Sequence, residues 1–245
     1  MDTNVSTLST ARATGNRRPR LVIIEEHAAV ADVLDASLWG HYRVRSVIRS
    51  RQTSVAGVVA AARAARPDVA LVASKPGPLL DDEAVIARLR EVGVPVIVLS
   101  AAGVDDDPVH WGRCLLAGAD AVLSTSVDLA DLRETLDLVL EGRAPFCPVL
   151  AQRLRETAVR AAEDERWTAR HRLGSLSLRE RTIIAKLIFG RSPAQIARED
   201  VVAEATVRTQ IKSILAKLEV SSQLGAVALA RRAGWSTAYD LPAAS

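Results

Sequence analysis

The chain has few aromatic residues and almost no cysteine. Only 3% of its 245 residues are aromatic while 49% are hydrophobic, so its cores must be packed with Ala, Val, Leu and Ile. Cys114 and Cys147 belong to no paired motif, so we expect reduced thiols rather than a disulfide or a metal site. No apolar run is long enough for a membrane span, and the polar start lacks the apolar core of a signal peptide. These absences favour a cytoplasmic protein that contacts no membrane.

The sequence also lacks the motifs of common enzyme classes. It contains no phosphate-binding P-loop, no glycine fingerprint for a dinucleotide and no motif that pairs a nucleophile with a base. Its four histidines match no metal-ligand spacing. We therefore expect no enzyme activity, no catalytic residue, no metal and no cofactor.

Charge is distributed unevenly along the chain. Residues 21–142 contain 11 Lys and Arg against 18 Asp and Glu, a net charge of −7. Residues 143–173 contain 7 against 4, and residues 174–245 contain 10 against 6. This asymmetry indicates a nucleic-acid-binding carboxy-terminal part and a different role for the amino-terminal part. Uneven solvated surface charge would give the same pattern.

Short apolar runs alternate with amphipathic stretches through residues 20–142. The expected strands are Leu21–Ile24, Tyr42–Ile48, Val69–Ala73, Val94–Leu99 and Ala121–Leu123, and the expected helices are Ala28–Leu38, Ser54–Ala65, Asp81–Val92, Asp107–Ala117 and Leu129–Glu141. This alternation predicts a flavodoxin-like α/β domain, (βα)5, with a parallel sheet in the order 2-1-3-4-5. Ligands of such sheets bind at the carboxyl ends of strands 1 and 3, where Glu25, Glu26, Ala73 and Ser74 would meet.

The remaining segments are shorter. Residues 1–19 lack periodicity and predict a disordered basic tail, and residues 237–245 form a second tail. Residues 143–173 contain Pro145 and Pro148 before a charged stretch, which predicts a linker that is partly helical.

Residues 174–236 predict an all-α domain of four helices that contains a helix-turn-helix. Ser177 and Glu180 form one capping box, and Ser192 and Gln195 form a second with Pro at the first helical position. A third helix follows at about 204–218, and a fourth begins after Ser221-Ser222. Two helices joined by a tight turn, the second longer, are typical of a helix-turn-helix.

The third helix of this domain has two unlike faces. Its apolar face consists of Val207, Ile211, Ile214, Leu215 and Leu218, and its opposite face consists of Ala205, Arg208, Thr209, Lys212, Ser213 and Ala216. Cations and small side chains without acids suit the major groove of DNA. A plain solvated face with two basic residues is the alternative, but the two capped helices upstream and the basic charge favour DNA.

The segment LSLRERTIIAKLIFGRSPAQIA, followed by ATVRTQIKSILAKLEVSS, resembles the helix-turn-helix of LuxR/NarL-type (NarL/FixJ) response-regulator transcription factors. The resemblance implies that Arg208, Thr209 and Lys212 face the groove. It also implies that Thr206 belongs to the DNA-binding set and that Lys217 contacts the DNA backbone. The segment around residues 224–232 resembles the part through which this family dimerises.

Four positions depart from the family pattern. Gln195 replaces the usual Glu, Asp200 a core Leu, Ala203 a capping Ser and Gln210 a common His. The loss of a helix cap costs about 1 kcal/mol. We therefore expect a looser or differently packed turn at residues 199–204.

Residues 20–142 resemble the receiver domain of response regulators. In RLVIIEEH, Glu25 and Glu26 stand where the family places two acids for Mg²⁺. In VPVIVLSA, Ser100 stands at the usual Thr or Ser position, and in GADAVLSTS, Thr125 stands where the family has Lys.

The phosphate acceptor of a receiver is an aspartate on strand 3, and here none is found. Counting along PDVALVASKPG from Pro67 places Ala73 at that position, whereas counting back from Pro76 places Val72 there. Neither side chain can form an acyl phosphate, so the resemblance implies a degenerate phosphorylation pocket. Because the third carboxylate for Mg²⁺ is absent as well, we expect no functional metal site.

These features predict a dimeric, sequence-specific transcriptional regulator of double-stranded DNA that is controlled independently of aspartyl phosphorylation and is nucleoid-associated when bound. One alternative is an interaction module that heterodimerises with a related regulator and controls it. Another is a pseudo-receiver that senses a small molecule in the vacated crevice, although the sequence selects no ligand. Trp111, near the start of the fourth receiver helix, suits either an interface or the core.

Overall fold

The structure is a computed structural model that describes residues 17–52, 54–74 and 81–235. Most of the expected basic tail and all of the expected final tail lie outside these residues, as does the Pro-Gly turn that follows strand 3. The chain divides into two compact units, an N-terminal unit up to Ala158 and a C-terminal unit from Val159.

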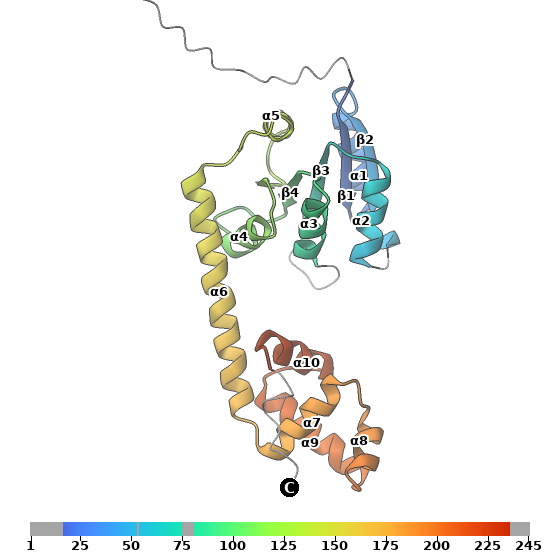
Figure 1. The fold of residues 1–245 in the computed structure, drawn as a ribbon, viewed down its shortest axis with the longest axis vertical. Coiled ribbons are helices and arrows are strands. Elements are labelled where there is room, and N and C mark those ends of the chain that lie inside the picture. The colour runs from blue at the N-terminus through green and yellow to red at the C-terminus, as the bar shows by residue number, and fades with distance from the viewer. Residues whose placement is uncertain (1–16, 53, 75–80, 236–245) are drawn as a thin grey trace, which may run out of the picture. The chain divides into compact units, whose positions relative to one another are not determined.

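The N-terminal unit contains a parallel five-stranded sheet in the order β2-β1-β3-β4-β5 (Figure 1). Its strands are β1 (Arg20–Glu25), β2 (Arg43–Ile48), β3 (Val69–Ser74), β4 (Val96–Ser100) and β5 (Ala121–Ser124). The predicted fold class and strand order are confirmed. Strand β4 begins two residues later than expected, because Gly93 has φ 78° and the Val94 N–H bonds back to the Leu89 carbonyl.

Helices cover both faces of this sheet. They are α1 (Ala28–Leu38), α2 (Val55–Ala64), α3 (Asp82–Glu91), α4 (Pro108–Leu116) and α5 (Leu129–Leu140), with a 3-10 turn η1 (Arg49–Arg51) after β2. One core lies between the sheet and helices α1 and α5, and the other lies between the sheet and helices α2, α3 and α4. Both cores are built mainly from Val, Ile, Leu and Ala, as the scarcity of aromatic residues requires.

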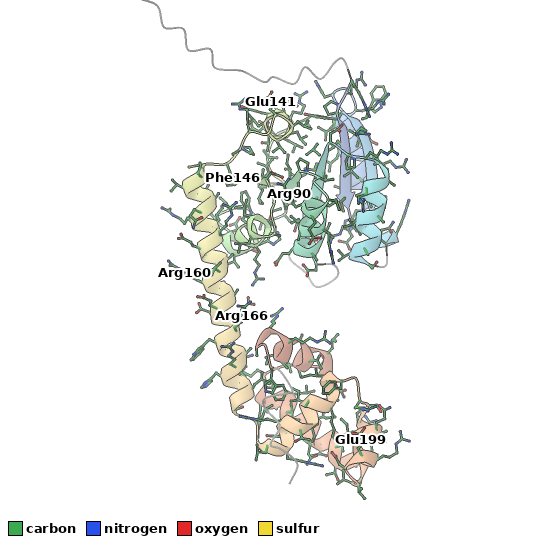
Figure 2. All side chains as sticks on the ribbon, viewed as in Figure 1. Arg90, Glu141, Phe146, Arg160, Arg166 and Glu199 are labelled. Atoms are coloured by element: carbon green, nitrogen blue, oxygen red, sulfur yellow. The ribbon has the colours of Figure 1, made fainter. Side chains whose placement is uncertain are left out.

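Helix α6 (Pro148–Gly174) is one unbroken helix of 27 residues, more helical than the expected linker. Within the N-terminal unit its first turns pack against α4, where Gly112 allows a close approach. A Cβ added at Gly112 would lie 2.1 Å from the Leu154 carbonyl oxygen. Trp111 is buried beside this contact, donates its indole N–H to the Ala102 carbonyl at 3.0 Å, and meets the ring of Phe146 edge-on. Figure 2 labels Phe146, which lies just before the start of α6. The core position predicted as one option for Trp111 is therefore the one it takes.

The C-terminal unit is all helical. After the last part of α6 it contains α7 (Leu178–Ile188), α8 (Pro193–Glu199), α9 (Glu204–Lys217) and α10 (Gln223–Arg232). Both predicted capping boxes are present, with Ser177 and Glu180 at α7 and with Ser192 and Gln195 at α8. The apolar faces of these helices and of the end of α6 share one core, so α8 and α9 form the predicted helix-turn-helix.

Candidate functional site

Helix α9 presents one apolar and one polar face. Val207, Ile211, Ile214 and Leu218 are buried in the core of the C-terminal unit. The predicted outward face is exposed throughout, with Ala205, Arg208, Thr209, Lys212, Ser213 and Ala216 at the surface. Thr206, which the resemblance adds to the DNA-binding set, is exposed as well. The helical period alone separates these two sets, which is why the sequence was sufficient to find them.

The cations of this face differ in their partners. The guanidinium of Arg208 is 65% exposed and pairs with Glu204, one turn earlier on the helix. Lys212 is exposed and makes no ion pair within the described part of the chain. The hydroxyl of Thr209 donates to the Ala205 carbonyl at 3.0 Å, which leaves its oxygen lone pairs and its methyl group facing outward.

Lys217 is held within the unit, which the resemblance alone did not indicate. Its Nζ lies 2.8 Å from Glu180 Oε2, and the Ser213 hydroxyl donates to the other Glu180 oxygen at 3.2 Å. Burial raises the pKa of Glu180, but the hydrogen bonds from Lys217 and Ser177 outweigh it and lower that pKa to about 2. The Glu180 carboxylate therefore ties α9 to the start of α7, while Lys217 stays 42% exposed.

The turn before α9 is differently packed rather than merely loosened. Asp200, which replaces a core Leu, ends α8 and pairs with Lys186 of α7 and with Arg179 at 3.1 Å. The next residue, Val201, is 91% exposed and has φ 52°, a left-handed conformation that β-branched residues rarely adopt. Ala203 precedes α9 without a side-chain cap, as its sequence implies.

At the carboxyl end of β1, the two predicted acids do not form an open metal site. Glu25 is buried, and its Oε1 atom accepts the backbone N–H groups of Glu26 and His27 at 2.8 and 2.9 Å. The carboxylate of Glu25 thus caps the turn that leads into α1. Among the described residues, no group of three or more His, Cys, Asp or Glu side chains is placed to hold a metal ion.

The other predicted pocket residues lie on neighbouring strands. Ala73 is half-buried near the end of β3, Ser100 is buried at the end of β4, and Thr125 is exposed just after β5. The sheet register pairs Ser100 with Ser74 rather than with Ala73. Ser74 is therefore the polar group at this edge.

A buried polar network surrounds Ser74. Its hydroxyl donates to Asp82 at 2.5 Å and lies 2.9 Å from His110 Nε2. Because the single hydroxyl hydrogen goes to Asp82, His110 must donate from Nε2. Asp82 also pairs with the buried guanidinium of Arg49, which in turn donates to the Ala73 carbonyl at 3.3 Å. We name Arg49, Ser74, Asp82 and His110 the β3-end network.

The sequence patterns did not predict the β3-end network. Asp82 has the pattern of a helix-start residue, and His110 follows the capping Asp107 of α4. Arg49 and His110 lie 25 and 36 positions from Ser74 along the chain, so no local pattern connects them. The Cys114 thiol lies next to His110. Burial, followed by the negative charges of Asp82 and Glu83, raises the pKa of the Cys114 thiol to about 12.

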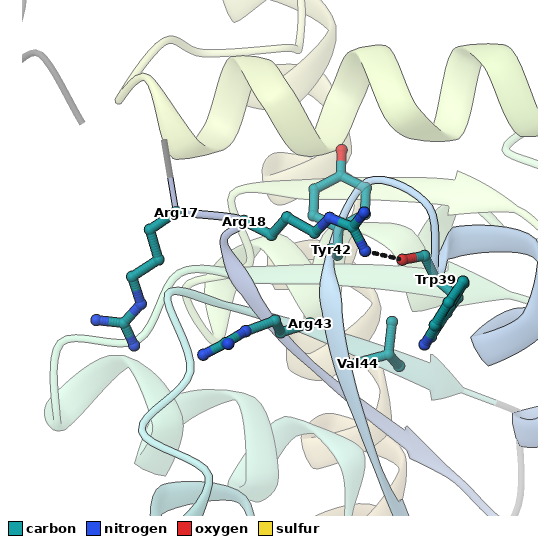
Figure 3. A pocket seen from close by; sticks show the side chains of 6 residues that line it. All are labelled: Arg17, Arg18, Trp39, Tyr42, Arg43 and Val44. Atoms are coloured by element: carbon teal, nitrogen blue, oxygen red, sulfur yellow. Dashed lines mark hydrogen bonds between the residues drawn. The ribbon is translucent and has the colours of Figure 1, made fainter. Parts of the chain in front are cut away.

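A surface cavity lies away from this edge, at the amino ends of the strands (Figure 3). It is lined by Arg17, Arg18, Trp39, Tyr42, Arg43 and Val44. The guanidinium of Arg18 lies over the Trp39 ring and donates to the Trp39 carbonyl, as Figure 3 shows. None of the residues predicted for the phosphorylation pocket lines this cavity. No helix of the described residues is long and apolar enough to cross a membrane.

Comparison with known proteins adds a family and several relatives. The model of bacterial regulatory proteins of the luxR family matches residues 174–230. A putative transcriptional regulator of Pseudomonas aeruginosa is 33% identical over 70% of this chain and 78% of its own length. The probable transcriptional regulatory protein NarL of Mycobacterium tuberculosis is 31% identical over 68% of this chain and 73% of its own length. The transcriptional regulatory protein DesR of Bacillus subtilis is 24% identical over 60% of this chain, which spans 65% of that relative.

Proposed function

Because the chain belongs to the luxR family and is a DNA-binding transcriptional regulator of the NarL response-regulator type, we propose that it binds double-stranded DNA sequence-specifically as a dimer. Each subunit inserts α9 into one major-groove half-site of a roughly two-fold operator, and is nucleoid-associated while bound. Thr206, Arg208, Thr209 and Lys212 form the contact surface. Lys217 adds a contact to the DNA backbone. The absence of enzyme motifs fits this family, whose members are regulators and not enzymes.

The observation that carries this proposal is the exposed face of α9. Its residues are cationic, hydroxylated or small, while the opposite face is fully committed to the core. Arg suits guanine, Thr and Ala allow close approach to bases, and Lys suits phosphate. A merely solvated face would need no such absence of acids beyond Glu204 at the first position.

We further propose that aspartyl phosphorylation does not control this regulator. Ala73 offers no carboxylate, and the β3-end network joins Ser74 to charged groups that already balance one another. Thr125, at the usual Lys position, supplies no cation to pair with a phosphoryl group. The N-terminal unit instead acts through contacts with protein partners.

The test is a footprint of the full-length protein on operator fragments selected from genomic DNA. Arg208→Ala should cost about 1–3 kcal/mol of binding and relax the sequence preference at one base pair, because a bidentate contact with guanine is lost. A footprint that this substitution leaves unchanged contradicts the placement of α9. Incubation with acetyl phosphate should alter neither mass nor affinity, and an aspartyl adduct in the N-terminal unit contradicts phosphorylation independence.

A heterodimeric regulator is the second candidate, supported by the uncapped start of α9 at Ala203. In that case the protein binds operators strongly only beside a related regulator with a fully capped recognition helix. Gel-shift assays of the protein alone and with related regulators distinguish the two candidates. The ligand-sensing alternative is the less favoured one, because Ser74, Asp82, His110 and Arg49 at this edge already bond to one another.

A further inference from the structure

The exposed arginine of the recognition surface is held by the one acid next to it. Glu204 is the first residue of α9, and its Oε1 atom accepts from Arg208 Nε at 2.9 Å and from Arg208 Nη2 at 2.6 Å. The side chains are 42% and 65% exposed. An exposed ion pair one turn apart contributes little to stability, so stability does not explain a role for the Glu204–Arg208 pair.

The geometry of this pair leaves the base-reading edge of Arg208 available. A guanidinium carries five N–H donors in a rigid planar fork. Glu204 uses the Nε hydrogen and one Nη2 hydrogen, so both Nη1 hydrogens and the second Nη2 hydrogen remain. The outer Nη1–Nη2 edge is one that can form two parallel bonds to O6 and N7 of guanine. Glu204 thus fixes the plane of the fork without occupying this edge.

The charge of Glu204 has a second consequence. A cation on a DNA-binding surface attracts any phosphate and adds affinity that does not depend on sequence. The carboxylate beside Arg208 offsets that cation and repels phosphates. Orientation and charge therefore act in the same direction, since both favour binding to the right sequence over binding to any sequence.

We propose that Glu204 is a positioning residue for sequence discrimination, which aims Arg208 at a guanine and lowers the attraction of α9 to DNA in general. This inference rests on the proposed function, because Arg208 must enter the major groove. It assigns a role in specificity to an acid that a charge-based description of the surface would count as unfavourable.

The test uses the full-length protein and a library of randomised duplexes from which bound sequences are selected. Glu204→Ala should flatten the base preference on the order of ten-fold at a single base pair, the same one that Arg208→Ala flattens. Glu204→Gln keeps an acceptor oxygen and should retain most of that preference. Both Glu204 variants should bind random duplex several-fold more tightly, with a steeper salt dependence.

Glu219→Gln is the matched control, because Glu219 is an exposed acid just beyond the other end of α9 that pairs with Arg172. It should leave the base preferences unchanged, and an equal effect there overturns the proposal as a general charge effect. Unaltered preferences in Glu204→Ala overturn it as well. A change at a base pair that Arg208→Ala leaves alone also overturns it, since Glu204 would then read a base itself.

Failure of the proposed function gives a different result. If the wild-type protein selects no sequence, sequence-specific binding by this protein alone is wrong. If the wild type selects a sequence and Arg208→Ala selects the same one, the placement of Arg208 in the groove is wrong. The Glu204 variants test the role of Glu204 only if the wild type and Arg208→Ala both behave as proposed.

Discussion

The charged groups at the end of β3 and those on the outward face of α9 are placed in opposite ways. In the N-terminal unit, Arg49 and Asp82 are buried and pair with each other beside the buried hydroxyl of Ser74. In the C-terminal unit, Arg208 and Lys212 face outward from α9. Buried charges need partners inside the protein, whereas exposed ones remain free for a partner outside. The same residue types therefore serve rigidity in the first unit and, under the proposed function, recognition in the second.

The two regions therefore also differ in which polar groups they leave available to a ligand. The groups of the β3-end network pair with one another, at an edge of the sheet where a receiver would accept a phosphoryl group. On the outward face of α9, Lys212 makes no ion pair among the described residues, and Arg208 keeps its Nη1–Nη2 edge open beside Glu204. Substitutions in one unit should therefore change stability, and those on the face of α9 should change affinity.

The largest expected effect comes from removing one partner of the buried Arg49–Asp82 ion pair. Asp82→Ala removes the carboxylate beside the buried Arg49 and should destabilise the N-terminal unit by about 3–5 kcal/mol. The free energy of unfolding is measured by urea denaturation, with hydrogen exchange in β3 and β4 as the local readout. The double variant Arg49→Met with Asp82→Leu should recover most of the loss. A cost below about 1 kcal/mol would mean that these charges are solvated, and the comparison would fail at its first half.

A smaller loss is expected where α4 meets α6. In Gly112→Ala the new Cβ would collide with the Leu154 carbonyl oxygen and the Ala158 side chain, so overpacking should cost about 1–3 kcal/mol. Gly174→Ala is the matched control, because nothing lies within 4 Å of its added Cβ. Thermal unfolding of both variants gives the comparison. Equal melting temperatures would show that α4 and the first turns of α6 separate easily within the N-terminal unit.

The turn of the helix-turn-helix offers a gain in stability. Val201→Gly relieves a left-handed conformation that costs an L-residue about 1–2 kcal/mol and should stabilise the C-terminal unit by about 1 kcal/mol. Val202→Gly, one position later and without positive φ, should destabilise it instead. The denaturation midpoints of the two variants should therefore move in opposite directions. If both fall, the side chain of Val201 contributes packing that outweighs its backbone strain.

The paired carboxylate of Glu180 also predicts a dependence of stability on pH. The pKa of Glu180 is about 2 in the folded protein, below its ordinary value of 4.5, so its bonds stabilise the C-terminal unit fully above about pH 4.5. That contribution is lost as the pH falls toward about 2. The stability advantage of the wild type over Glu180→Gln should shrink across this window, as measured by urea unfolding at several pH values. An advantage that stays constant would show that Glu180 is not bound in its ionised form.

Local patterns in the sequence carried most of the fold. The alternation of apolar runs with amphipathic stretches predicted all five strands and their order, because buried parallel strands need continuous apolar residues. The capping boxes predicted the starts of α7 and α8, because each uses only residues three apart. The outward face of α9 followed from the helical period. What these patterns share is that their physics acts over a few neighbouring residues.

Contacts between distant residues were beyond such patterns. The absence of an aspartate at Ala73 was plain from the sequence, but the pairing of Arg49 with Asp82 and the approach of His110 to Ser74 were not. The ion pairs of Asp200 were missed for the same reason, although a looser or differently packed turn was expected there. Each of these pairs joins different helices or strands.

By itself, then, the order of amino acids determined which segments become helix or strand, which face of α9 is exposed, and that no aspartate stands at position 72 or 73. Only the tertiary structure decided what occupies the end of β3 and how Lys217 and Asp200 are held. The reason is physical. Helical and strand periods follow from the geometry of the neighbouring backbone. The partner of a charged side chain is fixed only when folding brings remote side chains within hydrogen-bond distance.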